Sequence, residues 1–234
     1  MGEPVDPVAQ PFRDPEIPDG EETGYQASVG KDERYHVVSR VERLGETHYR
    51  HSINADLAEL ELAVKQIFVR AKGFLAAESY CAETTHEGKV VSREEGYFRG
   101  TKHLQFGGQV KPFPGDVMPL LGGMVALRGL DFARGSKRTV DLWLAFSVFW
   151  QLEVRVERRE TVRVPAGHLD AWRVRVRPSF SQISSLLDKV IGGLLPPFTL
   201  HFEAAAPHRM LRFEFPTGPL PWNPRGLVEA TKLD

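Results

Sequence analysis

The sequence predicts a mainly β protein: a single, strongly curved antiparallel sheet, a half-barrel or open barrel, with one or two short helices on its concave face. Three observations predict this fold. Most of the chain consists of short segments in which apolar and polar residues alternate, as they do in a strand with one buried face. Two segments depart from this alternation and favour helix. A sheet of this size also needs its concave face filled, and an amphipathic helix would fill it.

The N-terminal segment differs from the rest of the chain. Residues 1–19 contain five prolines and several acidic residues, so we expect an extended arm, followed by a single β-rich domain over residues 20–234. The arm has no apolar core and no basic start, which is unlike a signal peptide. We therefore expect a cytoplasmic protein from the sequence as written, and a periplasmic one if a leader has been removed.

Alternation predicts about eleven strands. The hairpin over residues 76–100 is the plainest, because Glu87-Gly88 suits its turn. Residues 139–150 are apolar on both faces, which predicts one strand covered on both sides or facing a cavity. The strand-forming segments are residues 23–30, 34–45, 47–57, 60–74, 76–100, 101–108, 139–150, 152–157, 160–178, 198–204 and 209–215, and residues 226–233 add a last candidate.

Two helices are expected. Residues 117–130 lack alternation and place Pro119 where a first helical turn tolerates it, although Gly122 and Gly123 weaken that helix. Residues 181–195 show the clearer pattern, with Ser181 as N-cap and two prolines after the end. Their apolar residues form one continuous stripe at helical spacing: Ile183, Leu186, Leu187, Val190, Ile191 and Leu194.

The stretch Glu160–Pro178 raises the question of a nucleic-acid surface, because four arginines lie among valines and a tryptophan. The alternation predicts a half-buried hairpin with Arg163, Arg173, Arg175 and Arg177 facing solvent and paired with acids on adjacent strands. Val164, Trp172, Val174 and Val176 are expected on the buried face.

The overall charge favours no nucleic-acid partner. The 234 residues include 30 basic and 31 acidic side chains, a formal net charge of −1, whereas a nucleic-acid footprint needs a basic excess. A single cysteine, Cys81, excludes an internal disulfide and a cysteine-rich metal site. No run of eighteen apolar residues occurs, so no integral membrane segment is expected. The oligomeric state is left open.

Motifs for catalysis and metal binding are not found. There is no nucleophile elbow and no phosphate-binding loop. His48 and His51 would face opposite sides of a strand, His36 completes no ligand set, and His201 and His208 are expected to flank a surface turn. The sequence thus indicates no metal site and no cofactor.

Paired carboxylates are no more informative. Glu94-Glu95 and Glu21-Glu22 are adjacent in sequence, so each pair divides between two faces or lies in a turn, and solvation explains them. No catalytic residue is predicted.

The remaining signal is a surplus of apolar residues, which either seals an ordinary core or lines a cavity for an apolar molecule. We expect non-enzymatic binding of a hydrophobic small molecule or lipid in the concave face. The alternatives are an enzyme that uses a polar residue of the same pocket, and a structural or interaction protein with a filled core. The predicted ligand-binding residues are Met124, Leu127, Phe146, Phe149, Ile183, Leu187, Val190, Ile191 and Leu194.

Three stretches resemble a bacterial family, the domain of unknown function 3108: residues 17–30 (IPDGEETGYQASVG), 119–143 (PLLGGMVALRGLDFARGSKRTVDLW) and 154–176 (VRVERRETVRVPAGHLDAWRVRV). Residues 198–215 resemble its closing strand pair, but Phe202 and Ala205 or Ala206 stand where a Trp and an Asp are common. The resemblance covers residues 20–233. It implies a curved half-barrel, similar to carriers of lipoproteins or lipids in bacterial envelopes, in a family whose members are commonly exported. It implies no reaction and no catalytic residues.

Overall fold

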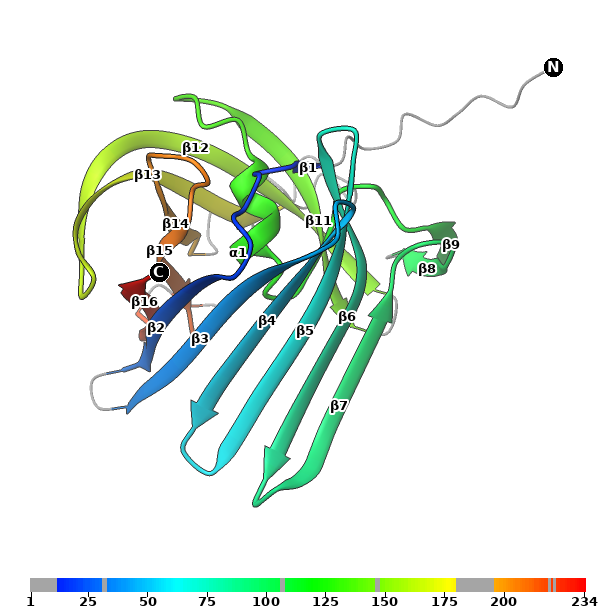
Figure 1. Cartoon of the computed structure of the whole chain (residues 1–234), viewed down its shortest axis with the longest axis horizontal. Coiled ribbons are helices and arrows are strands. Elements are labelled where there is room, and N and C mark those ends of the chain that lie inside the picture. The colour runs from blue at the N-terminus through cyan, green and yellow to red at the C-terminus, as the bar shows by residue number, and fades with distance from the viewer. Residues whose placement is uncertain are drawn as a thin grey trace.

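One large, strongly curved sheet dominates the protein (Figure 1). The computed structural model describes residues 12–30, 33–105, 108–145, 148–179, 196–218, 220 and 222–234. Fourteen strands hydrogen-bond side by side in the order β1-β6-β5-β4-β3-β2-β16-β15-β14-β13-β12-β11-β10, with β7 on β6. The mainly β, curved-sheet fold predicted from the alternation is confirmed.

The strands of this sheet are β1 (Phe12–Arg13), β2 (Glu21–Val29), β3 (Glu33–Leu44), β4 (His48–Leu57), β5 (Leu60–Ala71), β6 (Phe74–His86), β7 (Lys89–Tyr97), β10 (Val117–Pro119), β11 (Lys137–Ala145), β12 (Val148–Val164), β13 (Gly167–Pro178), β14 (Phe198–Glu203), β15 (Met210–Pro216) and β16 (Arg225–Leu233). A separate hairpin pairs β8 (Lys102–Gln105) with β9 (Gln109–Pro112). A short helix α1 (Gly123–Ala126) continues into the 3₁₀ turn η1 (Leu127–Gly129).

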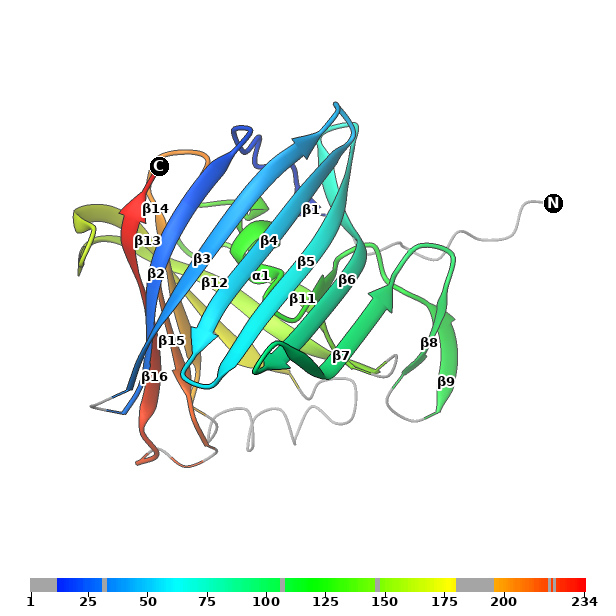
Figure 2. The same cartoon turned by 60° about the horizontal axis from the view of Figure 1, so that its bottom comes forward.

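Neighbours in sequence are mostly neighbours in the sheet. Strands β2 to β7 form one antiparallel meander and β11 to β16 another, and the pairing of β16 with β2 joins the two. The sheet curves around but does not close: β10 lies against β6, and no hydrogen-bonded pairing joins them among the described residues (Figure 2). The two ends of the sheet therefore meet along an open line.

Two expected elements differ from the structure. Residues 139–150 are not one strand: they include the end of β11 and the start of β12, which pair with each other, as Trp143 does with Phe149. Residues 117–130 are not one helix, since Val117–Pro119 pair as a parallel strand with Asp141–Trp143. The apolar runs were equally compatible with buried strands, and long-range pairing decided between them. The expected helix at 181–195 lies outside the described residues.

The expected hairpin turn at Glu87-Gly88 is confirmed. Both residues have positive φ, 51° and 73°, as a tight two-residue turn between antiparallel strands requires.

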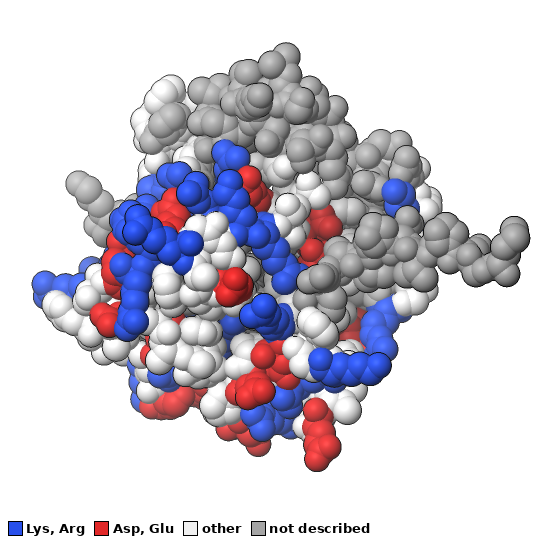
Figure 3. All heavy atoms as spheres, turned by 90° about the horizontal axis from the view of Figure 1, so that it is seen from above, with Lys and Arg blue, Asp and Glu red and all other residues white. Residues whose placement is uncertain are grey.

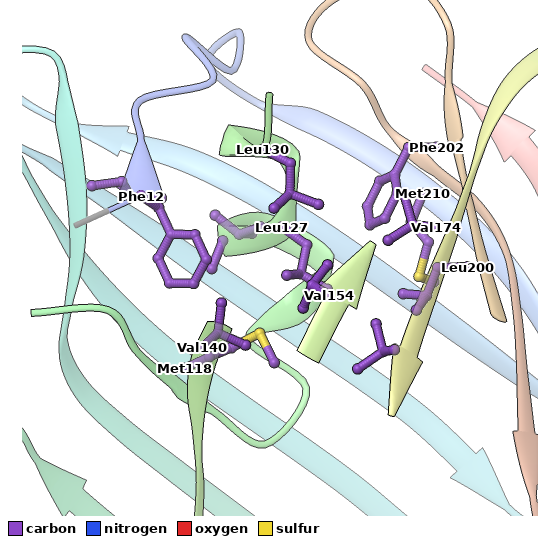
Figure 4. Close-up of a cluster of buried hydrophobic side chains, with 14 of the residues drawn as sticks. Phe12, Met118, Leu127, Leu130, Val140, Val154, Val174, Leu200, Phe202 and Met210 are labelled. Carbon is purple, nitrogen blue, oxygen red and sulfur yellow. The ribbon is translucent and has the colours of Figure 1, made fainter. Parts of the chain in front are cut away.

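The core lies on the concave face around α1 and η1 (Figure 4). Leu127 is only 2% exposed, and in Figure 4 it lies with Leu130 between Phe12 on one side and Phe202 and Met210 on the other. Gly129 lets β1 cross η1 closely, because a Cβ there would lie 2.1 Å from the Arg13 carbonyl oxygen. A short helical segment therefore fills part of the concave face, as a sheet of this curvature requires.

The hairpin β12–β13 carries the four arginines for which a solvent-facing position was predicted. Arg163 and Arg175 are exposed and Arg173 and Arg177 half-buried, whereas Val164, Val174 and Val176 are buried. Trp172 is only half-buried. Three of the arginines pair with acids on β12: Arg173 with Glu157 (3.0 Å), Arg175 with Glu157 (3.6 Å) and Arg177 with Glu153 (3.2 Å). Arg163 has no acidic partner among the described residues.

Candidate ligand pockets

An aromatic cluster lies along the line where the two ends of the sheet meet. It comprises Tyr80 on β6, Phe98 after β7, His103 on β8, Phe113 after β9, Trp143 on β11 and Phe149 on β12, and we call it the aromatic seam.

The seam packs mainly edge to face. The Trp143 ring centroid lies 5.3 Å from that of Tyr80 and 5.5 Å from that of Phe98, with steep interplanar angles. His103 stacks on Phe113 at 4.6 Å and meets Phe149 at 4.4 Å. Such pairs add roughly 0.5–1.5 kcal/mol each beyond their buried area. Ring packing, rather than a hydrogen-bonded ladder, thus holds the ends of the sheet together.

A pocket of about 630 Å³ adjoins the seam. Phe113 and Trp143 supply its apolar walls, and Gly96 on β7 lets Trp143 approach, because a Cβ there would lie 3.0 Å from the indole ring. Its other lining residues are polar or amphipathic: Ser92, Arg93, Glu94, Glu95, Tyr97, Thr101 and Lys102. We call this space the seam pocket. Aromatic walls beneath a charged rim suit an amphiphile, and the volume is typical of small-molecule sites.

A second pocket has a volume of about 510 Å³. Asp116 and Asp141 line it, although their side chains are almost entirely buried. Burial, together with the charge of Asp116, raises the pKa of Asp141 to about 7, and burial also raises the pKa of Asp116. We call it the carboxylate pocket. The carboxylate pairs considered from sequence, Glu94-Glu95 and Glu21-Glu22, contribute nothing to it.

Buried polar groups on the concave face have a different role. Arg128 on η1 forms two hydrogen bonds with the Glu21 carboxylate, at 2.6 and 2.9 Å, and a third with the Pro207 carbonyl oxygen at 2.7 Å. Burial lowers the pKa of His51 to about 3, and its Nε2 lies 2.9 Å from the Ser39 hydroxyl. These contacts fix η1 against β2 and leave His51 neutral, so they are structural.

The predicted ligand-binding residues fall in different places. Leu127 and the partly buried Met124 belong to the core on α1 and η1, whereas Phe149 belongs to the aromatic seam. None of these three lines the seam pocket or the carboxylate pocket. Phe146, Ile183, Leu187, Val190, Ile191 and Leu194 lie outside the residues that the structure describes.

The expectation for His201 was wrong. His201 lies within β14, is buried, and its Nε2 lies 2.9 Å from the Glu160 carboxylate across the sheet. Strand β14 has a nearly continuous buried run, because both of its faces are covered, so alternation could not locate the histidine. Among the described residues no group of three or more His, Cys, Asp or Glu is placed to hold a metal ion.

Charges of both signs lie together on the face seen from above in Figure 3, where Lys and Arg are interspersed with Asp and Glu over its described part.

The described helices include none with the length and apolar character needed to span a membrane.

Comparisons with known proteins bear on the fold alone. No family model and no curated protein matches the chain, so the resemblance to the domain of unknown function 3108 stays a prediction. The chain is similar to a β-barrel-like protein of the domain of unknown function DUF1849 from Brucella abortus, with a TM-score of 0.52 and 11% identity over 92% of this chain and 98% of that one.

Two further solved structures are less similar. A protein from Bacteroides fragilis, assigned as exported and with a YmcC-like fold, has a TM-score of 0.35 and 10% identity over 96% of this chain and all of the other. A protein from Parabacteroides distasonis assigned as a lipoprotein has a TM-score of 0.32 and 9% identity over 96% and 99%. These similarities are too low to indicate a compartment, so the cytoplasmic expectation stays a prediction. By its fold, the chain is similar to a β-barrel-like bacterial protein that belongs to a domain family of unknown function.

Proposed function

We propose that the protein binds an apolar, lipid-like molecule without chemically changing it, and that the ligand occupies the seam pocket. The observation that carries this proposal is the open line of the sheet, closed by aromatic rings beside a pocket of about 630 Å³. Ring contacts can separate and re-form without breaking a backbone ladder, so a chain-like ligand could enter there.

The lining fits an amphiphile. Trp143 and Phe113 offer apolar walls, and Phe149 supports them through His103. The charged rim includes Lys102 and Arg93, of which Arg93 is paired with Glu95 and Glu83. Lys102 has no ion pair among the described residues, so it would meet an anionic head group. The concave face beside Leu127, by contrast, is filled with side chains. The apolar stripe predicted between residues 183 and 194 stays a prediction, and the proposal does not depend on it.

The test is an equilibrium titration of delipidated protein with a fluorescent fatty-acid analogue. We expect saturable binding that weakens at least about tenfold in Phe113→Ala, because a lost apolar wall costs roughly 1.5–3 kcal/mol of burial. Trp222→Ala is the matched control, since Trp222 is a strongly exposed aromatic side chain that lines neither pocket. Absence of saturable binding by the wild type, or equal weakening in the control, would exclude the proposal.

A further inference from the structure

The pairing of β10 with β11 brings together the two aspartates of the carboxylate pocket. In the parallel pair β10–β11, Val117 lies opposite Asp141, which brings the preceding residue, Asp116, beside Asp141. The two side chains are 4% and 8% exposed, and the Oδ1 atom of each has no hydrogen-bond partner among the described residues. Buried polar atoms almost always have partners, and an unpaired one costs free energy. Both atoms belong to residues that line one pocket, which points to a ligand that donates hydrogen bonds to these two carboxyl groups.

The charges around the pocket are balanced. Arg13, Lys137 and Arg138 line it together with Asp116, Asp131 and Asp141. Arg138 interacts with its surroundings, since its guanidinium lies 4.5 Å from the centre of the Phe12 ring and its charge acts on Asp116. Arg13 and Lys137 are exposed and form no ion pair with any described residue. One part of the lining thus offers acceptors and another offers free cations.

We propose that the carboxylate pocket binds a zwitterion, with a primary ammonium group held by Asp116 and Asp141 and an anionic oxygen group held by Arg13 and Lys137. An ammonium supplies three N–H donors for the unpartnered carboxylate oxygens. A phosphate or carboxylate at the other end pairs with the two cations. The volume of about 510 Å³ accommodates such a molecule.

A bare divalent cation fits this lining less well. Calcium takes six to eight oxygen ligands, and the three basic side chains on the lining repel it. The carboxylate pocket shares no lining residue with the seam pocket, so binding in it does not depend on the apolar ligand proposed for the seam pocket.

The test is isothermal titration of the full chain with O-phosphoethanolamine. We expect saturable binding that weakens about tenfold or more in Asp141→Asn, because a charge-assisted hydrogen bond is lost. Lys137→Ala should weaken it as well, and this exposed position carries little risk to folding. Asp56→Asn and Lys89→Ala, both at exposed positions outside the pocket, are the matched controls and should bind like the wild type.

Two further probes test whether the ligand needs N–H donors and whether it is a lipid head group or a free zwitterion. Phosphocholine, whose quaternary ammonium has no N–H donor, should bind at least about tenfold more weakly than phosphoethanolamine. A lysophosphatidylethanolamine that binds more tightly than phosphoethanolamine, and still loses affinity in Asp141→Asn, would assign a lipid head group; equal affinities would assign a free zwitterion.

Three results would overturn the proposal. They are no saturable binding of either amine, equal binding of phosphocholine, and affinities that both Asp141→Asn and Lys137→Ala leave unchanged. Binding of calcium or magnesium alone, lost in Asp141→Asn, would likewise replace the zwitterion with a metal ion.

Discussion

Asp141 is a carboxylic acid in surroundings that disfavour its charge. Burial and the neighbouring charge of Asp116 raise its pKa from 3.8 to about 7 in the folded protein. Between these two pH values the folded state binds more protons at this site than the unfolded state, so stability falls as pH rises from about 4 to about 7.

The fall of stability with rising pH predicts how the stability of the Asp141→Asn variant depends on pH. The variant should match the wild type below pH 4 and become the more stable of the two as pH rises to 7, by a difference on the order of 2–4 kcal/mol. Urea unfolding at several pH values measures the difference. A difference in the free energy of unfolding that stays constant with pH would show that the pKa of Asp141 is not raised by folding.

The buried pair of Arg128 and Glu21 is the strongest polar contact of η1. Glu21→Ala leaves the Arg128 guanidinium charged and almost fully buried, so we expect a loss of about 3–5 kcal/mol in the free energy of unfolding. The neighbouring Glu22→Ala is the matched control, since Glu22 is only half-buried and has no ion pair among the described residues. Similar losses in both variants would mean that the pair does not anchor η1.

At the scale of single elements, the hairpin β12–β13 carries a network of charge pairs on a solvated face. Arg175→Ala removes a 3.6 Å contact with Glu157 between partly exposed side chains, so the free energy of unfolding should change by at most about 1 kcal/mol. Thermal unfolding measures this change. A salt-sensitive shift with RNA or DNA that is lost on the same substitution would instead identify a nucleic-acid surface.

Some strands could be predicted from the sequence and others could not. Alternation located β2 to β5 and the hairpin β12–β13, because each has one face more covered than the other. It failed at residues 117–119 and 139–150, where apolar residues are continuous and only the pairing partners determine the structure.

The pockets were beyond prediction for the same reason. Asp116 and Asp141 become neighbours only through the pairing of β10 with β11, and no local pattern signals that pairing. The aromatic seam draws its rings from β6, β8 and β11 and from the ends of other strands, far apart in the sequence. The sequence singled out Phe149 as one of the surplus apolar residues, but it gave no sign that His103 would contact Phe149 or that Phe113 would stack on His103.

At the scale of the whole molecule, the sheet is an incomplete barrel whose ends are held by side chains. The seam is therefore expected to open at a lower free energy than the paired strands, since no hydrogen-bonded ladder joins the two ends of the sheet in the part of the chain that the structure describes. Hydrogen exchange should report this difference: amides of β7 should exchange faster than those of β4, which is paired on both sides. Equal protection of the two strands would argue against an entry route at the seam.

The most direct test of ligand binding at the seam uses Trp143 as the probe. In a variant with Trp150, Trp172 and Trp222 replaced by Phe, a brominated fatty acid should quench the fluorescence of Trp143 saturably, because bromine quenches only over short distances and Trp143 lines the seam pocket. The matched variant that retains only Trp222, outside the pocket, should show no saturable quenching. Saturable quenching in the Trp143 variant alone is the predicted result; no quenching of Trp143, or equal quenching of both variants, would contradict the binding of an apolar ligand at the seam.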